Sequence, residues 1–461
     1  MPLGLSLQSV VCYGGALIAL LFLVAMYSRY ALDFPYADQW DFVPFLEKAS
    51  AGQLGWRDFW AQHNEHRLVF PRLLMLALAL PSHWNVYWEL AANVVLALAT
   101  WVALCLLARN SGRALHQGSN KPLYLIFALL VFSLSQWGNW FLGWQLQEFM
   151  NVLAAVLALA ALTWKRVPGA GLLAAAGFGI IATYSFANGL LVWPIGLFLL
   201  WLQRAERGAR FRLHAALWCA MAAAVLLSYF AGYESQPHHT PLLSALRQPF
   251  HCAFYVLGYL GQPAGRAADF ISIVIEILGL GTGPGAQVFC ILMGFLGLLF
   301  WGVTLAQLRF SGAPTRPLHF WTALALYAFG TATLTALGRV EEGVGQAISS
   351  RYVTMANLLW FAVAAQAYWA AQVVEGQLTR RALPIKLGVL CAALVLASLT
   401  GAYRWSERYH AYAALRDDLI HGQDPEKLRP LYPPAPERII ERRTVLEAHG
   451  WSVFRSGMKA D

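Results

Sequence analysis

Long apolar stretches alternate with shorter polar connections along almost the whole chain. Several of these stretches exceed the roughly 20 residues that an α-helix needs to cross about 30 Å of hydrocarbon. The pattern therefore predicts an all-α polytopic membrane protein with about eleven transmembrane helices. The predicted spans are residues 9–29, 84–108, 122–140, 148–164, 169–186, 189–203, 213–231, 286–308, 319–337, 352–373 and 385–403.

Composition agrees with this prediction and excludes a soluble protein. Of the 461 residues, 58% are hydrophobic and only 12% are charged, whereas about a quarter of the residues of a soluble domain are charged. The formal net charge is +9. A basic excess can indicate a nucleic-acid partner, but in a membrane protein it usually reports orientation. We therefore expect the lipid bilayer as a partner and no nucleic acid.

The distribution of charge along the chain predicts the orientation. Five alternate connections together carry a net charge of +12, whereas the connections between them sum to −2. Because basic loops remain in the cytoplasm, we expect the N-terminus to be cytoplasmic. The segments 29–83, 232–285 and 338–351 and the tail 404–461 are then extracytoplasmic.

The chain divides into a transmembrane domain, residues 1–403, and a small polar tail, residues 404–461. Within the first, residues 29–83 form a long extracytoplasmic loop in which interfacial helices are expected. Two further stretches, 250–262 and 268–282, are apolar but short and interrupted. They are predicted to be interfacial or re-entrant helices, because a single extra span would reverse the orientation of every later one.

The loop 29–83 is dense in ionisable side chains, and two carboxylates follow soon after the first span. Asp38 and Asp41 are three residues apart, a spacing that puts both on one side of a helical turn. They could act as a general base that deprotonates an acceptor hydroxyl. They could also bind a divalent cation such as Mg²⁺ or Mn²⁺ that neutralises a phosphate leaving group. The alternative is that they only cap and solvate the start of an interfacial helix.

A second polar cluster in the loop precedes the apolar run 68–80 and consists of His63, Glu65, His66 and Arg67. Its histidines are three residues apart rather than in a His-Glu-x-x-His arrangement, so a zinc site is not expected. These side chains either hold the loop against the membrane face through hydrogen bonds and ion pairs or bind a polar substrate.

Arg351 directly precedes the tenth predicted span, on the side of the membrane where few positive charges are expected. Its guanidinium could bind phosphate oxygens bidentately at the headgroup level, and Arg339 could supply a second contact. Tyr352 is a candidate for binding the substrate or organising this connection. The alternative is that Arg351 extends to the headgroups or pairs with Glu341 and Glu342.

Other outward-facing features carry less weight. Trp137, Trp140 and Trp144 are typical of the aromatic belt at a membrane interface, although they could stack on sugar rings. Glu148 and Asn188 lie at the ends of predicted spans and are left outside the predicted site.

Taken together, these features resemble the GT-C superfamily of integral-membrane glycosyltransferases. In that superfamily a first helix with a cytoplasmic N-terminus leads into a long extracytoplasmic loop with one or two functional acidic residues near its start. The matching segment here is AlaAspGlnTrpAsp at 37–41 with the amphipathic run after it. TyrSerPheAlaAsnGly at 184–189 and AlaIleSerSerArgTyr at 347–352 resemble segments of bacterial membrane proteins associated with this group.

The resemblance implies a bacterial inner-membrane enzyme of cell-envelope polysaccharide biosynthesis. Its donor would be a polyprenyl-phosphate sugar and its acceptor a glycan, lipid or protein, with inverting transfer at the outer membrane face. Asp38 or Asp41 would be the catalytic base or the metal-linked carboxylate, and Arg351 would help hold the donor phosphate. The chain lacks the strict AspXAsp motif and the large soluble C-terminal domain of better-known members, which leaves the metal and the acceptor open.

Two other functions fit the same architecture. A transporter or flippase for a lipid-linked sugar would also have many spans and a basic cytoplasmic side. Such proteins usually place ionisable residues in paired spans near the membrane midplane, whereas here Glu276 is nearly the only one within an apolar run. A polysaccharide polymerase or ligase would use a lipid-diphosphate donor instead.

Overall fold

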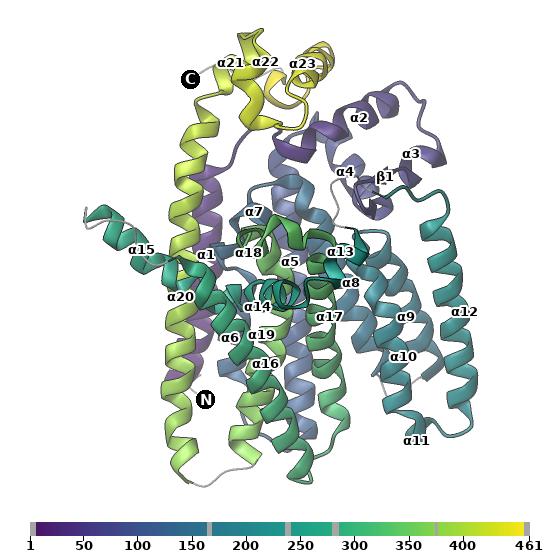
Figure 1. The fold of residues 1–461 in the computed structure, drawn as a ribbon, viewed down its shortest axis with the longest axis vertical. Coiled ribbons are helices and arrows are strands. Elements are labelled where there is room, and N and C mark those ends of the chain that lie inside the picture. The colour runs from purple at the N-terminus through teal and green to yellow at the C-terminus, as the bar shows by residue number, and fades with distance from the viewer. Residues whose placement is uncertain (1–5, 164–167, 236–240, 279–284, 374–376, 456–461) are drawn as a thin grey trace, which may run out of the picture.

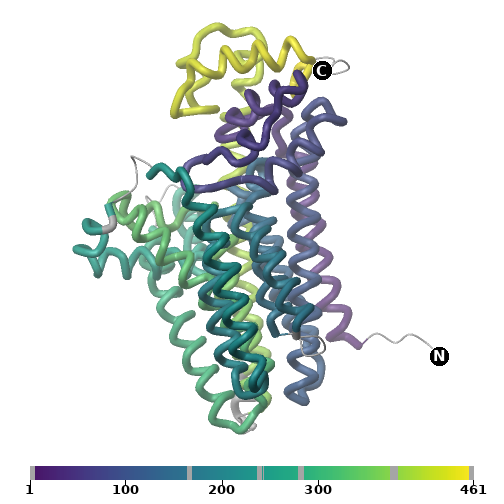
Figure 2. Tube along the Cα trace, turned by 90° about the vertical axis from the view of Figure 1, so that its right-hand side faces the viewer, coloured from purple at the N-terminus to yellow at the C-terminus, as the bar shows by residue number. Residues whose placement is uncertain are grey.

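The computed structural model describes residues 6–163, 168–235, 241–278, 285–373 and 377–455. It confirms the all-α fold class: these residues form helices and loops, apart from one antiparallel hairpin of β1 (Gln62–His63) and β2 (His66–Arg67). The long helices run side by side in one bundle, with the two chain termini toward opposite ends (Figures 1 and 2). The chain is an all-α polytopic membrane protein.

Each of the eleven predicted spans overlaps a helix, although the helix in the span 122–140 ends at Val131. Eight segments of the described chain are long and apolar enough to cross a membrane. Seven of them contain α1 (Leu7–Tyr30), α5 (Val86–Ala114), α6 (Lys121–Val131), α8 (Leu146–Leu162), α12 (Arg210–Phe230), α16 (Ala286–Phe310) and α17 (Arg316–Arg339), and the eighth, Leu383–His421, includes most of α20 (Gln377–Ala413). The remaining three predicted spans correspond to α9 (Pro168–Thr183), α10 (Val192–Leu202) and α19 (Val353–Val373). The count of eleven spans stays a prediction.

Helix α19 forms the centre of the bundle. Of its 21 residues, 18 are buried, whereas only 5 of the 24 residues of α1 are buried. It packs against α6, α16 and α17. Peripheral helices instead expose large apolar side chains, such as Leu17 and Leu21 of α1, which is the surface that lipid would cover.

The connections that the sequence predicts to be basic meet at one end of the bundle. Arg316, at the start of α17, pairs with Glu206 of α11 (Arg204–Arg207). Ser111 near the end of α5 donates a hydrogen bond to the carbonyl oxygen of Pro317 at 3.2 Å. Lys165 and Arg166, which contribute to the predicted charge, lie outside the described residues. This grouping agrees with the predicted alternation of spans; the side of the membrane that each end faces stays a prediction.

The opposite end, here called the cap end, carries the first long loop and the C-terminal helices (Figure 1). The loop contains η1 (Ala37–Phe42), α2 (Val43–Ser50), α3 (Trp56–Trp60), the hairpin and α4 (Val69–Ser82). The C-terminal helices are α21 (Arg416–His421), α22 (Pro425–Leu428), η7 (Arg429–Leu431), α23 (Glu437–His449) and η8 (Ser452–Phe454). Short elements between the long helices are η2 (Leu134–Gln136), α7 (Trp137–Trp140), η3 (Gly143–Gln145), η4 (Ala187–Leu191), α13 (Leu242–Leu246), η5 (Val340–Glu342), α18 (Val344–Ala347) and η6 (Ser350–Tyr352).

The two short apolar stretches form α14 (Pro249–Gly265) and α15 (Ala267–Ile277), with residues 279–282 outside the described part. Neither helix is among the eight candidate spans. Helix α14 packs closely on α16, and glycines allow this approach: a Cβ at Gly261 would overlap the carbonyl of Cys290 and the backbone nitrogen of Gly294. Helix α14 is therefore packed into the bundle, whereas α15 contacts α20 and projects sideways from the bundle (Figure 1). That either helix is interfacial or re-entrant stays a prediction.

We expect Gly261→Ala to lower the free energy of unfolding by about 1–3 kcal/mol, because the added Cβ forces the α14 and α16 backbones apart. Gly302→Ala on α16 is the matched control, since nothing lies within 4 Å of a Cβ there; it should leave stability unchanged or slightly raised. Thermal unfolding in detergent, followed by tryptophan fluorescence, measures both. Equal midpoints for the two variants would contradict the close contact.

Candidate functional site

A polar cavity of about 300 Å³ lies at the cap end of the bundle. Its wall combines the hairpin with residues of η1, η3, η4 and η6 and of helices α8, α14, α17 and α19, so distant parts of the chain meet there. Charged, amide and tyrosine side chains make up most of the lining. The volume lies at the lower end of the range for small-molecule sites.

Seven of the nine site residues predicted from the sequence line this cavity: Asp38, His63, Glu65, His66, Arg339, Arg351 and Tyr352. The other two, Asp41 and Arg67, lie outside its lining. The structure thus brings together residues from the first loop and from the connection before α19, which are almost 300 positions apart in the sequence.

Arg67 organises the loop. Its guanidinium donates hydrogen bonds to the carbonyl oxygens of Tyr229 at 2.6 Å, Trp60 at 2.8 Å and Ala231 at 2.6 Å. The guanidinium also lies over the Trp60 ring, 5.2 Å from its centroid. Because its donors are occupied by main-chain carbonyls, Arg67 ties the hairpin to the end of α12.

The position of Asp38 depends on a buried anchor in the next residue. Gln39 donates to one carboxylate oxygen of Glu89 at 2.8 Å, and the indole nitrogen of Trp84 donates to the other at 2.8 Å. All three side chains are completely buried. Because a buried polar group without a partner is costly, this anchor fixes η1 against the start of α5 and leaves Asp38 facing the cavity.

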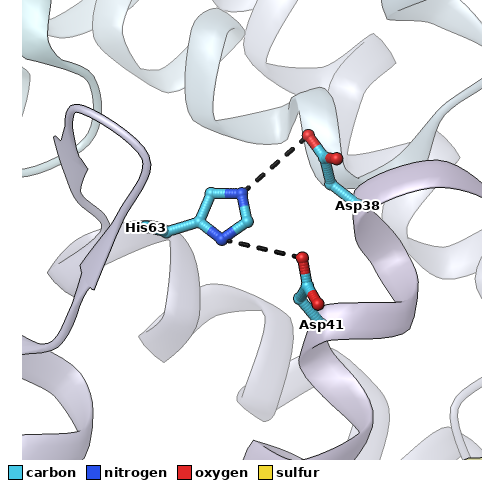
Figure 3. A group of neighbouring side chains, drawn as sticks. All are labelled: Asp38, Asp41 and His63. Atoms are coloured by element: carbon cyan, nitrogen blue, oxygen red, sulfur yellow. Dashed lines mark ion pairs between the residues drawn. The ribbon is translucent and has the colours of Figure 1, made fainter. Parts of the chain in front are cut away.

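His63 lies between the two predicted carboxylates (Figure 3). Its Nε2 is 3.9 Å from Oδ2 of Asp38, and its Nδ1 is 3.9 Å from Oδ2 of Asp41. The other oxygen of Asp41 accepts hydrogen bonds from the Tyr432 hydroxyl at 2.7 Å and from Arg442 at 2.9 Å. Asp41 is therefore directed toward the C-terminal helices, whereas Asp38 is directed toward the cavity.

The electrostatic surroundings keep Asp38 ionised. Burial raises the pKa of its carboxyl, but the contact with His63 and the positive charge of Arg351 outweigh burial and hold the pKa below its usual value. The side chain also retains 44% exposure. Asp38 is consequently a carboxylate at neutral pH and can accept a proton or face a cation.

Asp38, Asp41 and His63 are also the group that could hold a metal ion, since one donor atom from each lies within 4.8 Å of the others. Two carboxylates and an imidazole suit a divalent cation such as Mn²⁺. However, each carboxylate faces a different nitrogen of the imidazole, and a single cation can bind only one of these nitrogens. As it stands, the geometry suits an electrostatically paired triad better than three ligands of one ion.

Glu65, His66 and Arg339 form a second cluster in the cavity wall. Arg339 lies 3.4 Å from Glu65 and 3.6 Å from Glu342. His66 accepts a hydrogen bond from the backbone N–H of Ala187 at its Nδ1, 3.1 Å away, so that nitrogen carries no proton. Burial lowers the pKa of His66 to about 4, and the imidazole is therefore neutral at physiological pH.

Arg351 is the most available cation in the cavity. Its Nη2 donates to the Tyr352 hydroxyl at 3.3 Å, and its guanidinium lies 5.1 Å from the centroid of that ring. Its Nε is buried and has no hydrogen-bond partner among the described residues. Glu341 and Glu342 do not pair with it; Glu342 instead pairs with Arg339. Arg351 thus keeps donors free for a ligand.

Sequence reasoning did not assign several cavity residues to the site, of which Glu148 is the most informative. Its carboxylate is buried, accepts a hydrogen bond from Asn139 at 3.0 Å and interacts electrostatically with Arg351. Tyr259 of α14 lines the cavity as well and stacks on Tyr352 with ring centroids 4.9 Å apart. A charged side chain at the edge of an apolar span was the available signal for Glu148.

Fold and site together define a polytopic membrane protein with a cavity lined by polar and charged residues at one end of its helix bundle. Comparison with protein-family models, with curated proteins and with solved structures finds no match.

The buried His66 predicts a component of stability that depends on pH. Its folded-state pKa of about 4 lies below the unfolded value of about 6.5, so this contribution is fully present above pH 6.5 and is lost as pH falls to 4. Relative to His66→Asn, wild type should therefore lose up to about 3 kcal/mol of unfolding free energy between pH 7 and pH 4.

Thermal unfolding in detergent across this pH range measures the difference. His421→Asn, at an exposed position of α21, serves as the control and should follow wild type. Parallel profiles for wild type and His66→Asn would show that His66 is not a buried neutral imidazole.

Proposed function

We propose that the protein is an inverting glycosyltransferase that moves a sugar from a polyprenyl-phosphate donor to a glycan, lipid or protein acceptor of the cell envelope. The observation that carries this proposal is the combination of an ionised Asp38 and an arginine with free donors, Arg351, in one cavity. A base and a phosphate-binding cation are the two groups that such a transfer requires.

Asp38 supports the role of base. Its carboxylate lines the cavity, remains partly exposed and is oriented by His63. In the proposed reaction, the acceptor hydroxyl attacks the anomeric carbon while its proton passes to Asp38. The bond between the anomeric carbon and the phosphate oxygen breaks at the same time, and the lipid phosphate leaves with the electron pair.

Arg351 supports the role of phosphate ligand. The leaving phosphate gains negative charge, and a guanidinium can meet that charge with two parallel hydrogen bonds. Arg339 is already paired with Glu65 and Glu342, so we assign it a secondary part. Arg339 is the last residue of α17, and Arg351 lies just before the start of α19. We expect the lipid headgroup to reach the protein at these helix ends.

The cavity also borders the surface that lipid would cover. Leu334 of α17 lines the cavity and is 46% exposed, and Phe329 on the same helix is 42% exposed. A polyprenyl chain could therefore stay in the hydrocarbon along α17 while its phosphate enters the cavity. This apolar border supports a lipid-linked donor over a free nucleotide sugar.

The remaining lining suits a sugar ring. Gln145, Gln147 and Asn188 present amide groups to the cavity, and Oε1 of Gln147 is buried without a hydrogen-bond partner among the described residues. Unsatisfied amide groups are costly unless a ligand completes their hydrogen bonds. Sugar hydroxyls supply both donors and acceptors for such groups.

We expect Asp38→Asn to lower the rate of sugar transfer by about 10²–10⁴-fold, because the amide cannot accept the acceptor's proton. The assay is transfer of radiolabelled sugar from a panel of polyprenyl-phosphate donors by purified protein. Asp58→Asn, in the same loop and paired with Lys48 at 2.7 Å, is the matched control and should retain activity. Normal transfer by Asp38→Asn would show that Asp38 is not the general base. If wild type instead moves lipid-linked sugar across liposomes without transfer, the protein is a flippase.

Arg351→Gln tests the phosphate ligand separately. We expect it to raise the KM for the lipid-phosphate donor and to lower kcat/KM by about 10–100-fold, the loss of one charge-assisted contact of about 1.5–3 kcal/mol. Arg57→Gln, at an exposed position of α3, is the control. An unchanged donor KM in Arg351→Gln would assign the phosphate to another group.

A further inference from the structure

The C-terminal helices, residues 416–455, pack onto the segment that carries Asp38. This C-terminal unit lies directly above η1 and α2 at the cap end (Figures 1 and 2), and α23 contacts α2. The sequence alone describes it as a small polar appendage. Its contacts give it a more specific part.

The first contact holds the end of η1. Oδ1 of Asp41 accepts hydrogen bonds from both the Tyr432 hydroxyl at 2.7 Å and Nη1 of Arg442 at 2.9 Å. The side chains of Arg442 and Asp41 are 12% and 24% exposed, and the guanidinium also lies over the Tyr432 ring. These groups are largely shielded from water, so their interaction is stronger than that of an exposed ion pair.

The second contact holds the chain before η1. Nη2 of Arg416 lies 3.1 Å and its Nε lies 3.2 Å from Oδ2 of Asp33. Ser452 adds two bonds: its hydroxyl donates to the carbonyl oxygen of Asp33 at 3.4 Å, and its backbone N–H donates to that of His83 at 2.9 Å. The C-terminal unit therefore contacts Asp33 and Asp41, which lie before and after Asp38 in the sequence.

The segment between these two residues also has buried anchors to the helix bundle: Gln39 donates to Glu89 at 2.8 Å, and the Tyr36 hydroxyl donates to the carbonyl oxygen of Phe141 at 2.8 Å. It consists of a bend and a six-residue 3-10 helix, whose hydrogen bonds alone are weak. The two contacts from the C-terminal unit add to these anchors at either end of the segment. The contact with Asp41 also fixes the carboxylate that faces Nδ1 of His63.

We propose that the C-terminal unit is a clamp that positions Asp38 and His63, with Arg416, Tyr432 and Arg442 as its positioning residues. This inference rests on the proposed function, because it assigns the clamp to the base of the same reaction. Arg442 holds Asp41, Asp41 orients the imidazole of His63, and His63 faces Asp38 across the cavity wall. Asp41 is accordingly a structural carboxylate and Asp38 the reacting one.

Hydrogen exchange of the full-length protein in detergent tests the clamp without any assay of transfer. In Arg442→Gln and Arg416→Gln we expect the amides of residues 33–41 to exchange about tenfold faster or more, while the amides of α19 keep their protection. Arg429→Gln is the matched control, because Arg429 lies in the same unit and pairs with Glu426 on the exposed surface. Arg442→Lys, which keeps the charge, should restore most of the protection.

Kinetics supply the second measurement. Arg442→Gln and the milder Tyr432→Phe should lower kcat by about tenfold with little change in the donor KM, because misplacing the base affects the chemical step and leaves Arg351 in place. Unchanged exchange at 33–41 in the glutamine variants would overturn the clamp, as would exchange that rises equally in Arg429→Gln. If wild type transfers no sugar but the exchange pattern holds, the proposed function fails and the clamp stands.

Discussion

The site depends on one buried interaction, the pair of hydrogen bonds that Glu89 accepts from Gln39 and Trp84. A carboxylate inside an apolar bundle is tolerated only when both oxygens are satisfied, so Glu89 requires η1 and the turn before α5 to stay where they are. Gly143 permits this arrangement, because a Cβ there would overlap the side chains of Glu89 and Gln39. The first loop is thereby joined to the bundle at the residue next to Asp38.

Charge balance explains how so many ionisable groups share a small cavity. Glu65 is matched by Arg339, and Glu148 and Asp38 are both within the field of Arg351. Burial keeps His66 neutral and so removes one more charge. Among the described residues that line this cavity, Arg351 combines a positive charge with a side-chain nitrogen that has no hydrogen-bond partner, which supports the proposal of an anionic ligand.

The parts of the structure that could be predicted from the sequence are those set by local patterns. Apolar stretches correspond to helices, and the basic connections assemble at one end, because both follow from the composition of short segments. Asp38 and Arg351 could be singled out because charged residues beside predicted spans are few. Glu148 was passed over since its burial depends on Asn139 and α14, and the partners of Asp41 lie almost 400 residues away. Contacts at such separations leave no local signal.

The same distinction decides between the two acidic residues of η1. By sequence, Asp38 and Asp41 are equivalent: three residues apart, equally polar and equally close to the first span. In three dimensions one oxygen of Asp41 is occupied by Tyr432 and Arg442, whereas the carboxylate of Asp38 pairs with His63 and lines the cavity. Because Oδ1 of Asp41 already accepts two hydrogen bonds, that oxygen has less room for an approaching hydroxyl. We therefore propose Asp38 as the reacting carboxylate, with Asp41 keeping the imidazole between them in place.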